Sequence, residues 1–255
     1  LRGQTAGSIG RASSRERVSA TVGAVSEEGC NLFTTYFRPY DANMPWASHE
    51  NEALEIVEEL QKLGVDAAGF ELDLSRPTAP AELFAVVQER FGAANILVNN
   101  AAYSTSENID QLTAQSLDNH YAVNMRGMAL LCRQFVQQFG EGERVANGRI
   151  INISSGQGYG PMPEELAYAA SKGEVEAFSL SLSAELASRG ITVNAIDPGI
   201  TDTGWITDDL RQTVVARAPM GRIGTPEDAA RLVRFLASPE AGWITGQLIR
   251  SRGGL

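Results

Sequence analysis

The sequence is poor in cysteine and histidine, and each shortage excludes a class of protein. Its 255 residues include two cysteines, Cys30 and Cys132, and two histidines, His49 and His120. The cysteines form no CxxC pair, which argues against a disulfide framework or a zinc site. Two histidines are too few for a histidine-based metal centre, so we expect no metal. The cysteines are interpreted as small buried apolar residues.

Long apolar stretches are also missing. The longest runs, at 96–98 and 128–132, are too short to span a bilayer, and no segment has the order of a secretion signal. The formal net charge of −10 repels phosphate backbones and anionic lipid. We therefore expect a cytoplasmic protein that binds neither nucleic acid nor a membrane, although a local positive pocket still allows a nucleotide cofactor.

What the chain does have is an alternation of strand-like and helix-like segments, from about residue 28 onward. The expected strands are 31–36, 68–72, 95–98, 149–153, 192–196 and 247–250. The expected helices are 50–62, 80–91, 114–139, 165–188 and 226–237. Strands with continuous apolar centres, separated by helices, predict an α/β fold: a doubly wound parallel sheet of the Rossmann type with helices on both faces. No repeat or linker is present, so the prediction is one domain over 1–255.

Tyr168 and Lys172 form a candidate acid–base pair. Four residues apart in a helical segment, they project from the same face. A free tyrosine has a pKa of about 10 and is a poor acid–base catalyst at neutral pH. A lysine cation one turn away lowers that pKa, so the tyrosine can exchange a proton with an alcohol or alkoxide. Alone the pair is weak evidence, because an amphipathic tyrosine and a lysine with a buried stem often share this spacing by chance.

Polar or turn-forming residues stand at three successive strand ends. They occupy 99–100, 154–155 and 198–199. The carboxyl ends of parallel strands form the edge where α/β sheets bind ligands. A serine hydroxyl at Ser155 can therefore hold a substrate carbonyl oxygen near Tyr168. Together these positions predict an active site.

Six motifs carry a resemblance to a known family. They are ELDLS with Asp73, NNAA at 99–102, YAVNMRG with Asn124, ISS at 153–155, YAASK at 168–172 and NAIDPG at 194–199. In this order, with twelve residues between Ser155 and Tyr168, they closely resemble the short-chain dehydrogenase/reductase family over residues 28–255. The C-terminal stretch resembles the branch that includes 3-oxoacyl-acyl-carrier-protein reductases.

The resemblance implies a catalytic role for each motif residue. Tyr168 would be the general acid/base, and Lys172 would lower its pKa and bond the nicotinamide ribose. Ser155 would orient the substrate carbonyl and stabilise charge on its oxygen. Asn124 would kink its helix and hold a water that links Lys172 to solvent. Ser154 would have no role.

The resemblance also implies a dinucleotide site, a substrate lid and an assembly. The cofactor would contact Asp73, Leu74, Asn99, Ala101, Pro198, Gly199, Ile200 and Thr203. For Asp73 and Asn99, turn and cap chemistry is the alternative. Residues 201–219 would cover a small carbonyl or alcohol substrate, and we expect a 3-oxoacyl thioester or a similar ketone. Family members usually form dimers or tetramers, so a homo-oligomer is expected.

The cofactor preference depends on the end of the second strand of the family fold. No acidic residue stands at Tyr36, where NAD-selective enzymes tend to place an aspartate for the ribose diol. Arg38 could instead pair with a 2′-phosphate. We therefore favour NADP over NAD.

The first 27 residues depart from the family pattern. No apolar strand precedes Thr5, and the fragment TAGSIGRA lacks the full glycine spacing of a phosphate-binding turn. Three interpretations compete. Gly7 and Gly10 serve the phosphates in a diverged loop; the chain has lost its cofactor; or a reading-frame slip in a GC-rich gene produced this segment. The third, which we favour, predicts a sheet without its first central strand, or a poorly ordered segment.

Two functions follow. The first is an NAD(P)-dependent oxidoreductase that moves a hydride between nicotinamide and a carbonyl or secondary alcohol. The alternative is a catalytically silent homologue that binds a small molecule or a partner. Cofactor binding discriminates between them.

Overall fold

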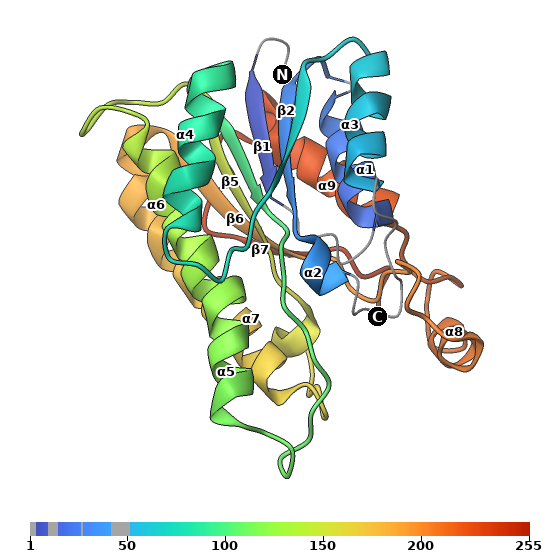
Figure 1. Ribbon diagram of the computed structural model, residues 1–255. Coiled ribbons are helices and arrows are strands. Elements are labelled where there is room, and N and C mark those ends of the chain that lie inside the picture. The colour runs from blue at the N-terminus through green and yellow to red at the C-terminus, as the bar shows by residue number, and fades with distance from the viewer. Residues whose placement is uncertain (1–3, 10–14, 27, 42–51) are drawn as a thin grey trace.

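The computed structural model describes residues 4–9, 15–26, 28–41 and 52–255 (Figure 1). Its centre is a seven-stranded sheet in the order β3-β2-β1-β4-β5-β6-β7, with every neighbouring pair parallel. The strands are β1 (Thr5–Ile9), β2 (Asn31–Tyr36), β3 (Ala67–Glu71), β4 (Ile96–Asn99), β5 (Gly148–Ile153), β6 (Ile191–Asp197) and β7 (Leu248–Arg250). The predicted doubly wound parallel sheet is confirmed.

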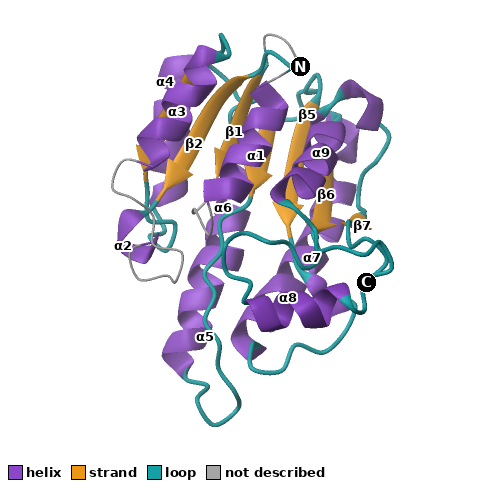
Figure 2. Ribbon diagram, turned by 90° about the vertical axis from the view of Figure 1, so that its right-hand side faces the viewer, coloured by secondary structure: helices purple, strands orange, loops and turns teal. Residues whose placement is uncertain are grey.

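Helices cover both faces of the sheet (Figures 1 and 2). One face carries α4 (Ala79–Phe91), α6 (Met128–Gln137) and α7 (Leu166–Leu186), and the other carries α1 (Arg15–Ser26), α3 (Glu52–Lys62) and α9 (Pro226–Ala237). Short helices α2 (Arg38–Asp41), α5 (Ala114–His120) and α8 (Asp208–Val215) lie beyond the carboxyl ends of the strands. Within the described residues, no helix combines the length and the apolarity needed to cross a bilayer.

Two apolar cores hold these layers together. Phe33, Leu131 and Phe135 belong to the core under α4, α6 and α7, and Ile96 and Leu236 belong to the core under α1, α3 and α9. Strands β4, β5 and β6 are buried along their whole length, as their continuous apolar runs predict.

The N-terminal segment contradicts one expectation. β1 lies in the centre of the sheet, where Ala6 pairs with Leu32 of β2 and Ile96 of β4. The prediction that the sheet lacks this strand is therefore wrong. The small side chain of Ala6 is only 1% exposed and lies in the apolar core under α1, α3 and α9. Gly7 is also misassigned: it lies within β1 rather than in a turn after it. Gly10 falls outside the described residues.

The helix expected over 114–139 is interrupted. α5 ends at His120, a π-helical segment, η1, spans Tyr121–Gly127, and α6 follows. Such segments often mark functional sites, and this one contains Asn124.

Candidate active site

The carboxyl ends of β4, β5 and β6 meet at one edge of the sheet (Figure 2). Asn99 ends β4, Ser154 and Ser155 follow β5, and Pro198 follows β6. The parallel pairing of β4 with β5 and of β5 with β6 brings these three ends side by side. The strand-end residues identified in the sequence thus share one region.

Helix α7 carries Tyr168 and Lys172 to this edge. Lys172 is 3% exposed, and its Nζ donates a hydrogen bond of 2.7 Å to the carbonyl oxygen of Ile153 at the end of β5. The same Nζ lies 5.7 Å from the centre of the Tyr168 ring. A buried ammonium near a half-exposed phenol is an arrangement that favours the phenolate.

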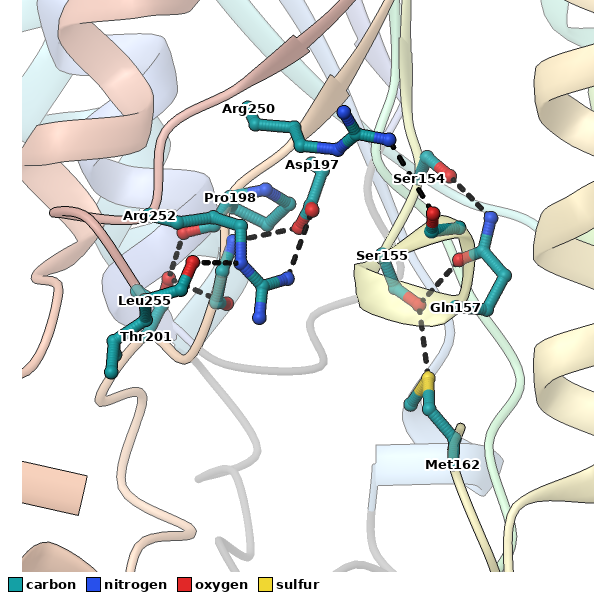
Figure 3. Close-up of polar contacts among 12 residues, drawn as sticks. Ser154, Ser155, Gln157, Met162, Asp197, Pro198, Thr201, Arg250, Arg252 and Leu255 are labelled. Carbon is teal, nitrogen blue, oxygen red and sulfur yellow. Dashed lines mark hydrogen bonds and ion pairs between the residues drawn. The ribbon is translucent and has the colours of Figure 1, made fainter. Parts of the chain in front are cut away.

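Ser155 is held by a glutamine that the sequence analysis did not identify (Figure 3). Its hydroxyl donates to Gln157 Oε1 at 2.9 Å. The amide of Gln157 in turn donates to Glu176 Oε1 at 2.6 Å, and the Ser154 hydroxyl donates to the same oxygen at 2.8 Å. Ser154 therefore tethers this loop to α7. Glu176 lies four residues after Lys172 on α7, and that spacing was the available signal.

Asn124 connects η1 to two neighbours. Its Nδ2 donates to the carbonyl oxygen of Tyr103 at 2.9 Å and to Ser171 Oγ at 2.8 Å. Its Oδ1 accepts from the Tyr103 backbone N–H at 2.6 Å. Because Ser171 directly precedes Lys172, this amide fixes the loop after β4 against the helix that bears the lysine.

A buried histidine adjoins the tyrosine. The ring centre of His120 lies 4.9 Å from that of Tyr103 and 6.4 Å from that of Tyr168. Burial lowers the pKa of His120, which favours a neutral imidazole at physiological pH. Its Nδ1 lies 2.9 Å from the Ser116 carbonyl oxygen, and that contact assigns the proton to Nδ1. The sequence analysis considered this histidine only as a metal ligand.

The turn after β6 is clamped by the C-terminal segment (Figure 3). Gly199 has a φ of 65°, in the region that favours glycine, and its N–H donates to Asp197 Oδ1 at 2.9 Å. Arg252 Nη1 binds the other oxygen of Asp197 at 2.9 Å. Nearby, the carbonyl oxygen of Ile200 accepts a hydrogen bond from the Gly224 N–H at 3.1 Å. Thr203, expected at the nicotinamide carboxamide, is buried.

Two asparagine side chains near the end of β4 carry polar atoms without partners. Asn99 Nδ2 donates to Asn152 Oδ1 at 2.8 Å. Within the described part of the chain, the buried atoms Asn99 Oδ1 and Asn100 Nδ2 have no hydrogen-bond partner. Buried amide atoms normally find partners, so this edge suits a ligand with hydroxyl or amide groups, as a nicotinamide nucleoside has. Ala101 is half-buried beside them and packs against the core.

The predicted adenine contacts lie at the end of β3. Asp73 Oδ1 accepts from the Ser75 N–H at 2.9 Å, which is the turn chemistry that stood as its alternative. Leu74 is 2% exposed in the core, and its carbonyl oxygen lies 2.9 Å from where a Cβ on Gly127 would stand.

Arg38 is engaged by an acid that the sequence analysis missed. Its Nε lies 3.1 and 3.0 Å from the two oxygens of Glu71, and its Nη2 lies 2.5 Å from Oε2. The Arg38 backbone N–H also donates to Oε1 at 3.2 Å. The Arg38 side-chain hydrogen bonds are the main cause that lowers the pKa of Glu71. A 2′-phosphate at Arg38 would therefore meet a carboxylate already bound there.

Comparisons with known proteins agree with this architecture. A family model described as Enoyl-(Acyl carrier protein) reductase matches residues 19–255. "Uncharacterized oxidoreductase YjdA" of Bacillus subtilis is 45% identical over 254 residues, covering 94% of this chain and 97% of that protein. The 3-oxoacyl-[acyl-carrier-protein] reductase FabG of Staphylococcus epidermidis is 32% identical over 234 residues, 91% of each chain.

Solved structures match as well. A short-chain dehydrogenase/reductase from Serratia marcescens has a TM-score of 0.86 and 28% identity, covering 100% of this chain and 98% of that one. The angucycline C-6 ketoreductase LanV with bound NADP has a TM-score of 0.85 and 30% identity, covering 100% and 96%. On the family model and these relatives, the chain belongs to the short-chain dehydrogenase/reductase family of NAD(P)-dependent oxidoreductases.

Proposed function

We propose that this protein is a carbonyl reductase or alcohol dehydrogenase in which Tyr168 transfers the proton. The observation that carries the proposal is the buried Lys172 ammonium, 5.7 Å from the Tyr168 ring and bonded to the end of β5. A structural lysine would gain little from burial beside a phenol, because desolvating an ammonium costs free energy.

The residues divide the work of a reduction as follows. A bound nicotinamide supplies the hydride. Tyr168 gives its proton to the carbonyl oxygen, and the Lys172 cation stabilises the phenolate that remains. The Ser155 hydroxyl turns from Gln157 to the substrate oxygen and stabilises the charge that develops there. Asn124 keeps Lys172 in position through Ser171.

The cofactor would extend along the strand ends, and we propose NADP in preference to NAD. Its nicotinamide end would meet Pro198, Gly199, Ile200 and Thr203, and its ribose would bond Lys172. Further along, it would meet Asn99 and Ala101, then Asp73 and Leu74. Arg38 would bind the 2′-phosphate. The support is the arginine after β2 and the NADP bound by LanV. Gly7 has no part in this proposal, because it lies inside β1.

For the substrate we propose a 3-oxoacyl thioester or a similar small ketone. Similarity to the FabG 3-oxoacyl-[acyl-carrier-protein] reductases supports a 3-oxoacyl carbonyl as the group that is reduced. Residues 201–219, which contain α8, would form the lid over it. We further propose a homo-oligomer, a dimer or tetramer, in keeping with exposed apolar side chains such as Trp243 at 97% and Leu180 at 61%.

The test is reduction of a panel of ketones, including a 3-oxoacyl thioester, by NADPH. Tyr168→Phe keeps the ring and loses the proton, so kcat should fall by about 10²- to 10⁴-fold. Full activity in this variant would refute the mechanism. A nucleotide fluorescence titration runs beside it, and a well-folded protein that binds no nucleotide would instead be a silent homologue.

A further inference from the structure

A carboxylate and a guanidinium are paired where β2 and β3 end. Register places Glu71, the last residue of β3, beside Tyr36, the last residue of β2, and Arg38 follows two residues later. Three side-chain contacts of 2.5 to 3.1 Å join the Arg38 guanidinium to the Glu71 carboxylate. Both side chains remain accessible, at 52% and 29% exposure, so a ligand can reach either.

The Arg38 guanidinium favours a nucleotide with a 2′-phosphate, whereas the Glu71 carboxylate favours one with a free ribose diol. A guanidinium binds a phosphate best through two parallel N–H donors. In Arg38, Nε and Nη2 are both directed at Glu71. A 2′-phosphate must therefore compete with a carboxylate for one guanidinium, and it meets a like charge beside it.

A ribose diol is instead attracted by the carboxylate. Its hydroxyls are donors, and a carboxylate is the strongest acceptor that a side chain offers. β2 ends at Tyr36, and neither Tyr36 nor the following Phe37 is an acid. Glu71 reaches the same place from the neighbouring strand, so it can accept from a free 2′-hydroxyl where the sequence around Tyr36 offers nothing.

We propose that Glu71 is a specificity-determining residue that narrows the preference for 2′-phosphorylated nucleotides by occupying Arg38. The inference rests on the proposed dinucleotide site at this edge. The wild-type protein then discriminates only weakly between NADP and NAD, because the attraction of Arg38 and the repulsion of Glu71 largely cancel. Neutralising Glu71 weakens its bonds to the guanidinium and shifts the balance toward the phosphate.

The experiment measures binding by isothermal titration calorimetry on the full chain, with adenosine 2′,5′-bisphosphate and 5′-AMP as probes. These probes differ only in the 2′-phosphate and need no catalysis. In Glu71→Gln, affinity for the bisphosphate should rise about five- to tenfold, as expected for regaining a charge-assisted bond at a half-exposed site. Affinity for 5′-AMP should stay the same or fall.

Two further variants isolate the pair. Arg38→Met should lower the affinity for the bisphosphate relative to 5′-AMP, and in that background Glu71→Gln should raise the ratio less than it does in the wild type, because only the repulsion of Glu71 is then relieved. Asp66→Asn is the matched control, because Asp66 is an exposed acid that pairs with Arg90 at 2.8 Å just before β3 begins. It makes the same change in net charge and should leave the ratio of affinities unaltered.

The outcomes separate the two proposals. If both probes bind and Glu71→Gln leaves their ratio as in the wild type, Glu71 is not a determinant, although the nucleotide site stands. If neither probe binds wild-type protein or any variant, the nucleotide site itself is refuted, and the inference falls with it. Circular dichroism checks that each variant folds, and Glu71→Ala replaces Glu71→Gln if the glutamine variant does not fold.

Discussion

Replacing Arg252 by methionine tests whether the C-terminal segment holds the turn after β6. The Asp197 side chain is 1% exposed and the Arg252 side chain 14% exposed, so their ion pair at 2.9 Å is shielded from water. Arg252 Nε also donates to the carbonyl oxygen of Leu255 at 3.1 Å. Its guanidinium lies 4.6 Å from the centre of the Tyr159 ring. Methionine retains the apolar stem and removes all three polar contacts.

The magnitude follows from what remains around the carboxylate. In the variant, Asp197 keeps the Gly199 N–H on Oδ1, and its other oxygen loses the cation. Removing one partner of a buried ion pair costs about 3–5 kcal/mol, because a buried charge is left uncompensated. The pair lies near the surface, so we expect the low end, about 3 kcal/mol. In a chain of this length that lowers Tm by roughly 6–12 °C.

Urea unfolding measures the free energy, with Arg231→Met as the control. Arg231 is 70% exposed and lies 3.6 Å from Asp228, so its loss should change stability by less than about 0.5 kcal/mol. The double variant Asp197→Asn, Arg252→Met should recover part of the loss, since neither charge is then left alone. A loss below about 1 kcal/mol in Arg252→Met would mean that water reaches Asp197, and the reasoning would be refuted.

Three other changes have definite outcomes. Gly127→Ala should cost about 1–3 kcal/mol in chemical unfolding, because its methyl would stand 2.9 Å from a backbone carbonyl oxygen, whereas Gly173→Ala, with open space around it, should not destabilise. Gln157→Ala should lower kcat about tenfold and leave KM for the nucleotide unchanged, because the loop that bears Ser155 loses its bond to Glu176 on α7 and Ser155 is positioned less well. Burial raises the pKa of Glu165 above its ordinary value of 4.5, so the ionised form costs stability in the folded state. Glu165→Gln should therefore have a higher Tm than wild type at pH 8 and an equal one near pH 4.

Of the seven strands in the described part of the chain, six could be predicted from the sequence, because each has β-branched or large apolar residues in a short run. β1 could not be predicted, and the reason is physical. Its TAGSI segment has little apolar bulk, and its place in the sheet centre depends on close packing between β2 and β4. Local periodicity did not predict the π-helical break at Asn124, although the family resemblance implied a kink there. The break accompanies hydrogen bonds between the Asn124 side-chain amide and the backbone of Tyr103, which lies 21 residues earlier. Local periodicity does not record a contact over that separation.

The candidate site likewise contains residues that local sequence could identify and residues that it could not. Tyr168 and Lys172 are recognisable because their spacing is local, and Ser155 because it follows a strand. The other polar pairs at this edge of the sheet join residues that are distant in sequence. Gln157 and Glu176 are 19 residues apart. Arg38 and Glu71 are 33 apart, and Asp197 and Arg252 are 55 apart. Composition gives no indication of which acid meets which base, since only the folded sheet brings them together.

These distant pairs bear on how a chain with a net charge of −10 can accept an anionic cofactor. At the edge of the sheet, Glu71 and Asp197 are each bound by an arginine, so neither carboxylate faces the cofactor region alone. Discrimination at Arg38 should then depend on its immediate partner rather than on the field of the whole protein. Asp66 directly precedes β3 and Glu71 ends it five residues later, which is about 16 Å at ~3.3 Å per residue. That distance is twice the screening length of about 8 Å at physiological salt. Removing one charge at Glu71 should therefore change nucleotide preference, and removing one at Asp66 should not.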